Sequence, residues 1–247
     1  MLILKNVKKK FWDLKAVDNI SFQIGDGEIV SLIGSNGAGK TTLVNLISGY
    51  LKPDEGTILF NDRDITQASA YNRIKWGVGR SFQIINLFEN LSVLDNVRTP
   101  LFSKYGVIRR WFLPTSRYRK FTEQALEILR NFRLEEKRDA LPKELSEGDR
   151  KILDIAVAFA LKSRLLLLDE PTSGVATNDK FKVMDNIIAA IKKEGVSTLI
   201  IEHDMDIVSG YSDRVLVMHE GRLLTQGKPE EVMEDKEVRA HILGITD

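Results

Sequence analysis

The sequence contains no cysteine, which excludes disulfide bonds and metal sites built from thiolates. It also lacks an excess of one charge, because 36 basic and 35 acidic side chains leave a formal net charge of +1. Such a chain has no bulk electrostatic attraction to nucleic acid or to a membrane surface. Of the 247 residues, 43% are hydrophobic, so the chain can form a substantial core in one large domain or in a main domain with a subdomain.

Long hydrophobic runs are absent as well. No stretch of the sequence reaches the roughly 18 to 20 apolar residues that a membrane-spanning helix needs. Charged residues also break up the N-terminal region, which therefore lacks the pattern of a secretory signal peptide: Lys8, Lys9, Lys10, Asp13 and Lys15. We therefore expect a protein of the reduced cytosol that is soluble by itself and able to dock on a membrane protein.

Short apolar segments alternate with amphipathic ones along most of the chain. Residues 2–7 and 18–24 alternate between apolar and polar side chains, which is typical of half-buried strands. Residues 29–34, 165–169 and 197–202 are apolar runs, as in strands that are buried on both faces, and helical patterns follow them. This order predicts an α/β fold with a mainly parallel sheet and an added antiparallel β subdomain.

The middle of the chain has a different character. From about residue 85 the sequence is helical, charged and aromatic, with prolines as punctuation. We predict a single domain over residues 1–247, in which residues 1–84 and 161–247 form the α/β core and residues 85–160 form a helical subdomain.

The apolar run at 29–34 ends in a glycine-rich stretch with the spacing of a phosphate-binding P-loop, Gly34, four residues, and then Gly39-Lys40-Thr41. The glycines let the backbone wrap an anion, and free N–H groups at the start of the following helix point at it. Lys40 would neutralise the β- and γ-phosphates, and the Thr41 hydroxyl would hold Mg²⁺. The predicted nucleotide-binding residues are Gly34, Ser35, Asn36, Gly37, Ala38, Gly39, Lys40, Thr41 and Thr42. The alternative is a plain glycine turn before an amphipathic helix.

Residues 165–171, LLLLDEP, supply two acids at the end of a buried strand. Ligands bind at the carboxyl ends of the strands in open α/β sheets. Asp169 would hold the Mg²⁺, and Glu170 would be the general base that polarises water for ATP hydrolysis. The alternative is a core strand that ends in solvated acids before a proline turn.

Several further stretches resemble the nucleotide-binding subunits of ABC transporters, and the resemblance covers essentially the whole chain. LSEGDRK (145–151) resembles the signature loop, RSFQ (80–83) the Q-loop, PTSGV (171–175) the D-loop, and IIEHD (200–204) the switch-histidine region. Phe11 resembles the aromatic residue that stacks on adenine. The resemblance implies a P-loop NTPase core with a helical signature subdomain, and it implies ATP and Mg²⁺ as cofactors.

The resemblance also implies roles for single residues. Ser146 and Gly148 would receive a phosphate of ATP held by a second subunit, so that two chains close head to tail around two ATP molecules. Gln83 would contact Mg²⁺ or the attacking water, and His203 would donate a hydrogen bond to the γ-phosphate. Lys40, Gln83, Glu170 and His203 are thus the predicted catalytic residues, and Thr41, Gln83 and Asp169 the predicted metal ligands.

Each of these residues also has a simpler interpretation. Ser146 is a good helix cap in any protein, Gln83 can be a solvated polar residue, and His203 can be a structural histidine. Phe11 can be a core aromatic residue, and Trp12 is an alternative for stacking on adenine.

The sequence departs from the family pattern in two places. Glu147 and Asp149 stand where the family often has glycine or an aromatic residue, and glutamine. Asp149 would place negative charge near an incoming γ-phosphate, unless it points away or pairs with Arg150 or Lys151. In the D-loop, Ala176 stands where aspartate is usual, and Asp179 is a candidate substitute.

The finer sequence texture is similar to the ATPases of branched-chain amino-acid importers, with urea or amide importers and lipopolysaccharide exporters as alternatives. The insert at 103–120 mixes basic and aromatic residues, which is typical of contact with a membrane interface, a permease or nucleic acid, or of a solvated helix.

Two other classes of function remain as alternatives. A soluble ABC ATPase acting on DNA or ribosomes would need long heptad repeats or a second cassette, and neither is present. A P-loop kinase leaves the signature and His203 unexplained. We therefore expect a transport ATPase at the cytoplasmic face of the membrane, paired with a second ATPase subunit and membrane permeases, without nucleic acid.

Overall fold

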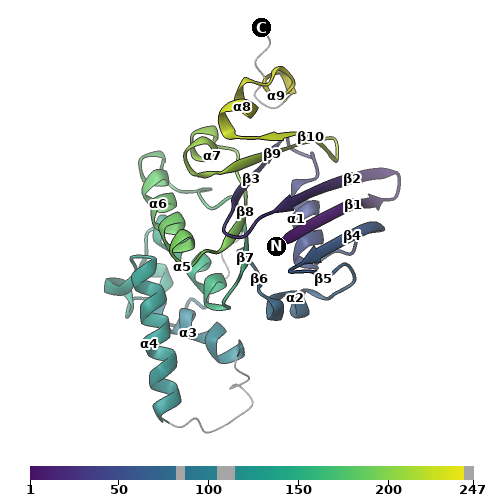
Figure 1. Ribbon diagram of the computed structural model, residues 1–247. Helices are drawn as coiled ribbons and strands as arrows, with labels where there is room; N and C mark the ends of the chain where they lie inside the picture. Colours follow the sequence, from purple (N-terminus) through teal and green to yellow (C-terminus); the bar gives the residue numbers. More distant parts are fainter. Residues whose placement is uncertain (82–86, 105–114, 242–247) are drawn as a thin grey trace. The chain divides into compact units, whose positions relative to one another are not determined.

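The computed structural model describes residues 1–81, 87–104 and 115–241 (Figure 1). The chain divides into two compact units. Unit 1 comprises Met1–Ile74 and Val196–Asp247, and unit 2 comprises Lys75–Gly195. The helical subdomain at 85–160 stays a prediction.

An antiparallel sheet forms the first part of unit 1, as the alternating segments predict. Its strand order is β2-β1-β4-β5, with β1 at Leu2–Phe11, β2 at Leu14–Ile24, β4 at Glu55–Phe60 and β5 at Arg63–Asp64. In the register, Leu2 lies opposite both Ile24 and Phe60, and all three side chains are buried. The sheet therefore buries one face, on which apolar side chains recur at every second position.

Strands β1 and β2 are longer than the sequence predicts. Lys8, Lys9 and Lys10 belong to β1, and the ammonium groups of the first two pair with acids on the neighbouring segment. Lys8 Nζ lies 2.6 Å from Glu55, and Lys9 Nζ lies 2.7 Å from Asp54. The two ion pairs stabilise charged side chains in the part of β1 that lies beyond the predicted apolar pattern.

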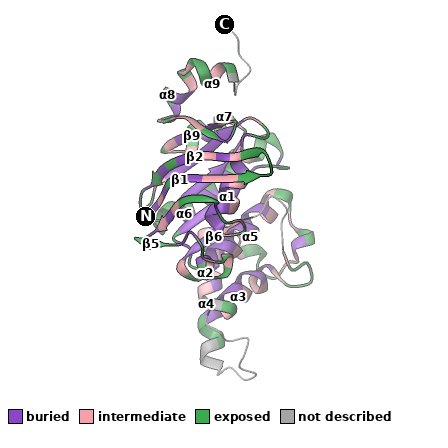
Figure 2. Ribbon diagram, turned by 90° about the vertical axis from the view of Figure 1, so that its right-hand side faces the viewer, coloured by how far each residue is buried: buried purple, intermediate pink, exposed green. Residues whose placement is uncertain are grey.

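Parallel strands form the second part of unit 1. Strand β3 (Ile29–Gly34) lies between β8 (Ser197–Ile201) and β9 (Arg214–His219) and runs parallel to both, and β10 (Arg222–Gly227) pairs antiparallel with β9. Strands β3 and β8 are buried along their whole length (Figure 2). This confirms the prediction that these apolar runs are strands covered on both faces.

Helices of unit 1 follow the strands. Helix α1 (Lys40–Ser48) follows β3, α7 (Met205–Tyr211) follows β8, and α8 (Pro229–Glu234) and α9 (Lys236–His241) follow β10. Valines from α7, β9, α8 and α9 and one isoleucine from β3 form a common core cluster: Ile33, Val208, Val215, Val217, Val232 and Val238. Among the described residues, no helix is both long and apolar enough to cross a membrane.

Unit 2 has a short parallel pair of strands and four described helices longer than one turn. Strand β6 (Val78–Arg80) pairs with β7 (Leu165–Asp169). The helices are α3 (Val93–Lys104), α4 (Thr115–Asn131), α5 (Glu147–Ala160) and α6 (Thr177–Lys193), with 3-10 turns η2 (Glu135–Lys137) and η3 (Pro142–Glu144) before α5.

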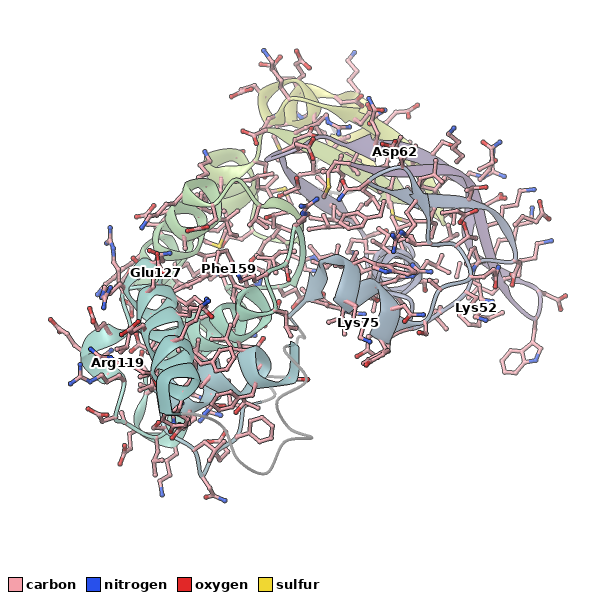
Figure 3. The ribbon with its side chains drawn as sticks, turned by 60° about the horizontal axis from the view of Figure 1, so that its bottom comes forward. Lys52, Asp62, Lys75, Arg119, Glu127 and Phe159 are labelled. Carbon is pink, nitrogen blue, oxygen red and sulfur yellow. The ribbon has the colours of Figure 1, made fainter. Side chains whose placement is uncertain are left out.

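Helix α4 is amphipathic, as its sequence predicts. Arg119 and Glu127 lie on its exposed side, whereas Phe159 of α5 points into unit 2, where its ring contacts Phe132 edge to face at 5.3 Å (Figure 3). Phe121, Ala125 and Leu129 of α4 are buried, so the apolar face of the helix is used for packing, which favours a structural role for residues 121–132.

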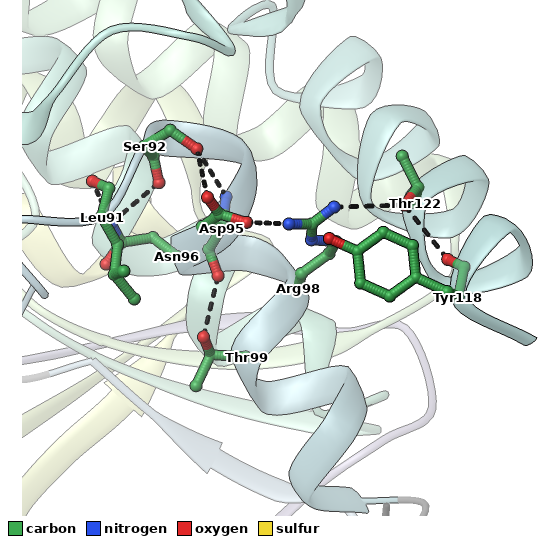
Figure 4. Close-up of polar contacts among 8 residues, drawn as sticks. All are labelled: Leu91, Ser92, Asp95, Asn96, Arg98, Thr99, Tyr118 and Thr122. Atoms are coloured by element: carbon green, nitrogen blue, oxygen red, sulfur yellow. Dashed lines mark hydrogen bonds and ion pairs between the residues drawn. The ribbon is translucent and has the colours of Figure 1, made fainter. Parts of the chain in front are cut away.

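A polar network fixes the start of α3 and ties it to α4 (Figure 4). The Ser92 hydroxyl accepts a hydrogen bond from Asp95 N at 3.1 Å and so caps the helix. Asp95 also pairs with Arg98, whose Nη1 donates to the Thr122 hydroxyl at 3.3 Å. The Arg98 guanidinium lies over the Tyr118 ring, 4.7 Å from the centroid.

Arg73 of α2 (Ala70–Trp76) is fully buried, although its segment reads as polar. Its Nη1 donates to the carbonyls of Leu46 (2.5 Å) and Ile47 (2.8 Å) in the last turn of α1, and Nη2 donates to Thr66 O at 3.0 Å. Burial lowers the pKa of Arg73 to about 10, so the guanidinium stays charged at neutral pH. A cation at the carboxyl end of α1 also complements the helix dipole.

We predict that Arg73→Met destabilises the protein by about 3 kcal/mol or more, because each buried carbonyl left without a donor costs about 1–3 kcal/mol. Urea unfolding measures the change. The exposed Lys52 (Figure 3) provides the control, since Lys52→Met should change stability by less than about 0.5 kcal/mol. Equal effects of the two substitutions would contradict this account of Arg73.

Candidate functional site

The predicted P-loop is a tight turn between β3 and α1 in unit 1. The Ala38 N–H donates to Ser35 O at 3.1 Å, and the Leu43 N–H donates to Gly39 O at 2.9 Å. Gly39 is the N-cap of α1 and provides no side chain to cap it. The first N–H groups of the helix therefore have no side-chain cap, as an anion-binding turn requires.

Lys40 folds back over this turn. Its Nζ donates to the carbonyls of Gly34 at 2.6 Å and Ser35 at 2.9 Å, and the side chain is buried. The two carbonyls hold the ammonium group within the loop. Of the remaining P-loop residues, Asn36, Gly37 and Thr41 are exposed, so their backbone or hydroxyl groups are accessible to a ligand.

Two glycines of the turn adopt left-handed backbone conformations, at φ +80° for Gly37 and +97° for Gly39. A Cβ at residue 39 would lie 2.1 Å from the Ala16 carbonyl oxygen, whereas a Cβ at residue 37 would meet open space. Glycine is thus required at 39 by both conformation and close approach, and at 37 by conformation alone.

The two acids of LLLLDEP lie in unit 2. Asp169 is the last residue of β7 and is buried, and Glu170 follows it in a left-handed conformation at φ +50°. Such a backbone is uncommon for a residue with a side chain and marks a sharp turn after the strand. Arg80, at the end of β6, pairs with Asp169 with 3.3 Å between Nη2 and Oδ2.

Sequence reasoning missed the role of Arg80, although it is the first residue of the RSFQ stretch. The available signal was a basic residue at the end of a short strand next to an acid-tipped strand. Gln83 itself lies outside the described residues, and its predicted contact with Mg²⁺ or water stays a prediction.

Oxygen ligands are the chemistry that Mg²⁺ prefers, often with one or two protein groups and substrate phosphates. Asp169 offers a carboxylate at a strand end and Thr41 an exposed hydroxyl, so each fits this role. Within residues 1–81, 87–104 and 115–241, no cluster of three or more His, Cys, Asp or Glu side chains could hold a metal by itself.

His203 follows β8 and is exposed, which disfavours the alternative of a buried structural histidine. The backbone N–H of His203 donates to the carboxylate of Glu202 at 3.1 Å. Glu202 is buried at 3% exposure, and the sequence analysis assigned it no role. The next residue, Asp204, caps α7 by accepting a hydrogen bond from Asp206 N at 3.2 Å. The turn that carries His203 is therefore fixed on both sides.

Both candidates for adenine stacking lie at the hairpin between β1 and β2. Phe11 is 38% exposed and Trp12 is 98% exposed, so neither is a core residue. Lys9 Nζ lies 5.6 Å from the Phe11 ring centroid, which covers part of that ring. Phe11 stays the residue predicted to stack on adenine, with Trp12 as the alternative.

The signature serine begins α5 in unit 2. Ser146 is the N-cap residue, and its hydroxyl accepts from Asp149 N at 3.2 Å. Ser146 is nevertheless exposed. Gly148 packs this turn against α6, because a Cβ there would lie 2.9 Å from Val183 Cγ2. The simple capping role is thus present, and a role in phosphate binding stays a prediction.

Asp149 has a different partner from those expected. Its Oδ2 lies 2.5 Å from Lys137 Nζ, whereas Arg150 pairs with Glu89 at 2.6 Å. Consecutive helix positions face directions about 100° apart, so Asp149 and Arg150 meet different neighbours. Burial opposes ionisation of Asp149, but hydrogen bonds from Lys137 and Ser146 outweigh it and hold the pKa of the carboxyl below its ordinary value.

A cavity of about 370 Å³ joins the signature turn to the D-loop within unit 2. Ser146, Asp149, Ala176, Asp179 and Lys182 are among the residues that line it. Ala176 is the N-cap of α6 and makes no side-chain cap, whereas Asp179 is exposed in the first turn. Asp179 therefore faces the same space as the alanine that it was proposed to replace.

The insert at 103–120 falls mostly outside the described residues. Tyr118, Arg119 and Lys120 of α4 are exposed. Its contact with a membrane, a permease or nucleic acid stays untested.

Comparisons with known proteins identify the family. The family model described as "ABC transporter" matches residues 17–173, and the chain belongs to this family. It is accordingly an ATP-binding cassette with ATPase activity.

The chain is 34% identical to the probable branched-chain amino acid transport ATP-binding protein LivG of Archaeoglobus fulgidus, over 100% of this chain and 96% of that protein. It is 34% identical to the high-affinity LivG of Escherichia coli K12, over 99% and 98%. It is also 32% identical to the lipopolysaccharide export ATP-binding protein LptB of Haemophilus influenzae, over 99% and 97%.

Solved structures of ATP-binding cassettes also resemble this chain. An ABC-transporter ATP-binding cassette in its ADP conformation matches with a TM-score of 0.87 and 30% identity, over 99% of both chains. A dimeric post-hydrolysis cassette bound to ADP and Pi matches with a TM-score of 0.77 and 28% identity, over 93% of this chain and 99% of that chain. The P-loop NTPase type of α/β fold expected from the sequence is thus confirmed.

We predict that Gly39→Ala lowers ATP affinity by about tenfold or more, because the new methyl group forces the turn away from the Ala16 carbonyl. Gly37→Ala should cost only the left-handed strain of about 1–2 kcal/mol, with a smaller loss of affinity. Titration with a fluorescent ATP analogue measures affinity, and urea unfolding measures strain. Equal losses for both variants would show that the close approach at residue 39 is unimportant.

Proposed function

We propose that two copies of this chain, or one copy and a sister ATPase, close around two ATP molecules and drive a membrane permease that takes up branched-chain amino acids. The observation that carries the ATP-dependent part is the P-loop turn, in which Lys40 lies within a loop whose helix amides are uncapped. The solute rests on the full-length similarity to proteins named for branched-chain amino acid transport.

Residues of unit 1 bind and stabilise the phosphates in this proposal. The amides at Gly34–Thr42 surround the β- and γ-phosphates, and Lys40 supplies the positive charge. His203 donates a hydrogen bond to the γ-phosphate, where negative charge develops during cleavage. Phe11 or Trp12 stacks on the adenine ring.

In the same proposal, residues of unit 2 activate water and complete the binding site for the ATP of the second subunit. Asp169 and Gln83 would hold a Mg²⁺ that neutralises phosphate charge, and Thr41 of unit 1 is the third proposed ligand. Glu170 polarises the attacking water as general base. Ser146 and Gly148 receive the phosphate of ATP bound to the other subunit, for which the dimeric post-hydrolysis relative is the structural precedent.

Association with a permease places the protein at the cytoplasmic face of the membrane. A structural relative described as part of the cbiONQ transporter complex, with a TM-score of 0.83, supports such an assembly. The similarity to LptB favours lipopolysaccharide export as the second candidate. The test is to reconstitute the chain with its own permeases and to measure ATP hydrolysis with leucine or with lipopolysaccharide. Stimulation by leucine supports amino-acid uptake, and stimulation by lipopolysaccharide supports export.

We predict that Glu170→Gln keeps ATP affinity within about threefold but lowers turnover by about 100-fold or more, because the general base is lost while the phosphate contacts remain. The variant should accumulate as an ATP-bound dimer in size-exclusion chromatography with Mg²⁺. Lys40→Ala serves as the binding-deficient control, and exposed Glu234→Gln serves as the neutral one. A monomeric Glu170→Gln variant that hydrolyses ATP at the parent rate would rule out this assignment.

A further inference from the structure

The Ser146 hydroxyl is already engaged. It donates to Asp149 Oδ2 at 2.6 Å while it accepts from Asp149 N at 3.2 Å. A hydroxyl group has one proton, so Ser146 cannot donate to Asp149 and to a phosphate at the same time. Binding of a phosphate at this turn therefore requires the hydroxyl to leave the carboxylate.

Lys137 of η2 donates to the same oxygen atom. Its Nζ lies 2.5 Å from Asp149 Oδ2, and the two side chains are 47% and 20% exposed. If the serine hydroxyl turns away, the oxygen atom keeps a charged donor. Lys137 thus lowers the cost of releasing Ser146, because the partly buried carboxylate does not lose its last strong partner.

The charge around the signature turn explains why Lys137 would be important for binding a phosphate. The residues that line the cavity include two lysines and three acids, which gives a formal charge of −1: Lys137, Lys182, Glu147, Asp149 and Asp179. Without Lys137 the same surface would carry −2. An ATP phosphate would then approach a less compensated carboxylate at the start of α5, and partly buried charges are screened only weakly by salt.

We propose that Lys137 is a positioning residue of the signature turn: by neutralising Asp149 and staying bound to its Oδ2, it lowers the cost of releasing the Ser146 hydroxyl to the phosphate of the second subunit's ATP. This inference rests on the proposed ATP-dependent dimer and deepens it. It assigns a function to a residue outside the family motifs, and it explains how this chain works with an acid at position 149.

The test is a double-mutant cycle in the Glu170→Gln background, with Lys137→Ala, Asp149→Asn and the two combined. Analytical ultracentrifugation measures the ATP concentration that gives half-maximal dimer. Lys137→Ala should raise this concentration by about tenfold. In the Asp149→Asn background the same substitution should change it by less than about twofold, because no carboxylate remains to be neutralised.

Two controls separate this effect from others. Lys143→Ala removes the same charge from an exposed position in the neighbouring turn η3 and should leave dimerisation unchanged. Binding of a fluorescent ATP analogue to the dilute monomer should be the same in all variants, since the P-loop is untouched. Lys137→Gln, whose side chain is uncharged and one atom shorter, should behave like Lys137→Ala and replaces it if that variant does not fold.

A tenfold loss from Lys137→Ala that persists in the Asp149→Asn background would overturn the proposal, because Lys137 would then act independently of Asp149. Unchanged dimerisation of Lys137→Ala would overturn it as well. Failure of the parent to dimerise at saturating ATP would instead refute the proposed dimer, and this inference with it.

Discussion

The P-loop depends on a backbone turn that only glycine can make at residue 39. There the left-handed conformation coincides with a close approach to the Ala16 carbonyl. This backbone turn also fixes Lys40, whose ammonium group binds the carbonyls of Gly34 and Ser35. A buried cation and uncapped helix amides are thus gathered at one point, which is the arrangement that favours an anion. Arg73 secures the opposite end of the same helix by binding the carbonyls of its last turn.

Two acids of the proposed site in unit 2 are each held by a cation. Asp169 pairs with Arg80, and Asp149 pairs with Lys137. An unpaired, partly buried carboxylate would be costly and would repel phosphate, so these cations serve both stability and binding. The two pairs differ in kind, since Asp169 is expected to exchange its partner for a metal, whereas Asp149 keeps its lysine while Ser146 moves.

Local sequence patterns were sufficient to predict the buried strands β3, β7 and β8 and the helix after the P-loop. Each strand is a continuous apolar run, and the helix is an amphipathic segment that directly follows the P-loop glycines. The pairs that involve distant residues were not predictable. Lys137 and Asp149 are 12 positions apart and meet only because η2 lies beside the start of α5, and Arg80 is 89 positions from Asp169. Arg73 was missed for a similar reason, because an arginine in a polar segment is normally predicted to be exposed, and its partners, the carbonyls of Leu46, Ile47 and Thr66, come from other segments.

The central claim is that the P-loop of one chain and the signature turn of another hold the same ATP. The absence of native cysteine allows a direct measurement: one population carries Asn36→Cys in the P-loop and the other Glu147→Cys beside Ser146, both in the Glu170→Gln background and both at exposed positions. A short thiol-reactive cross-linker is added to the mixture. The account predicts a covalent dimer between the two populations only when ATP and Mg²⁺ are present. Equal cross-linking without nucleotide, or none at saturating ATP, would contradict it.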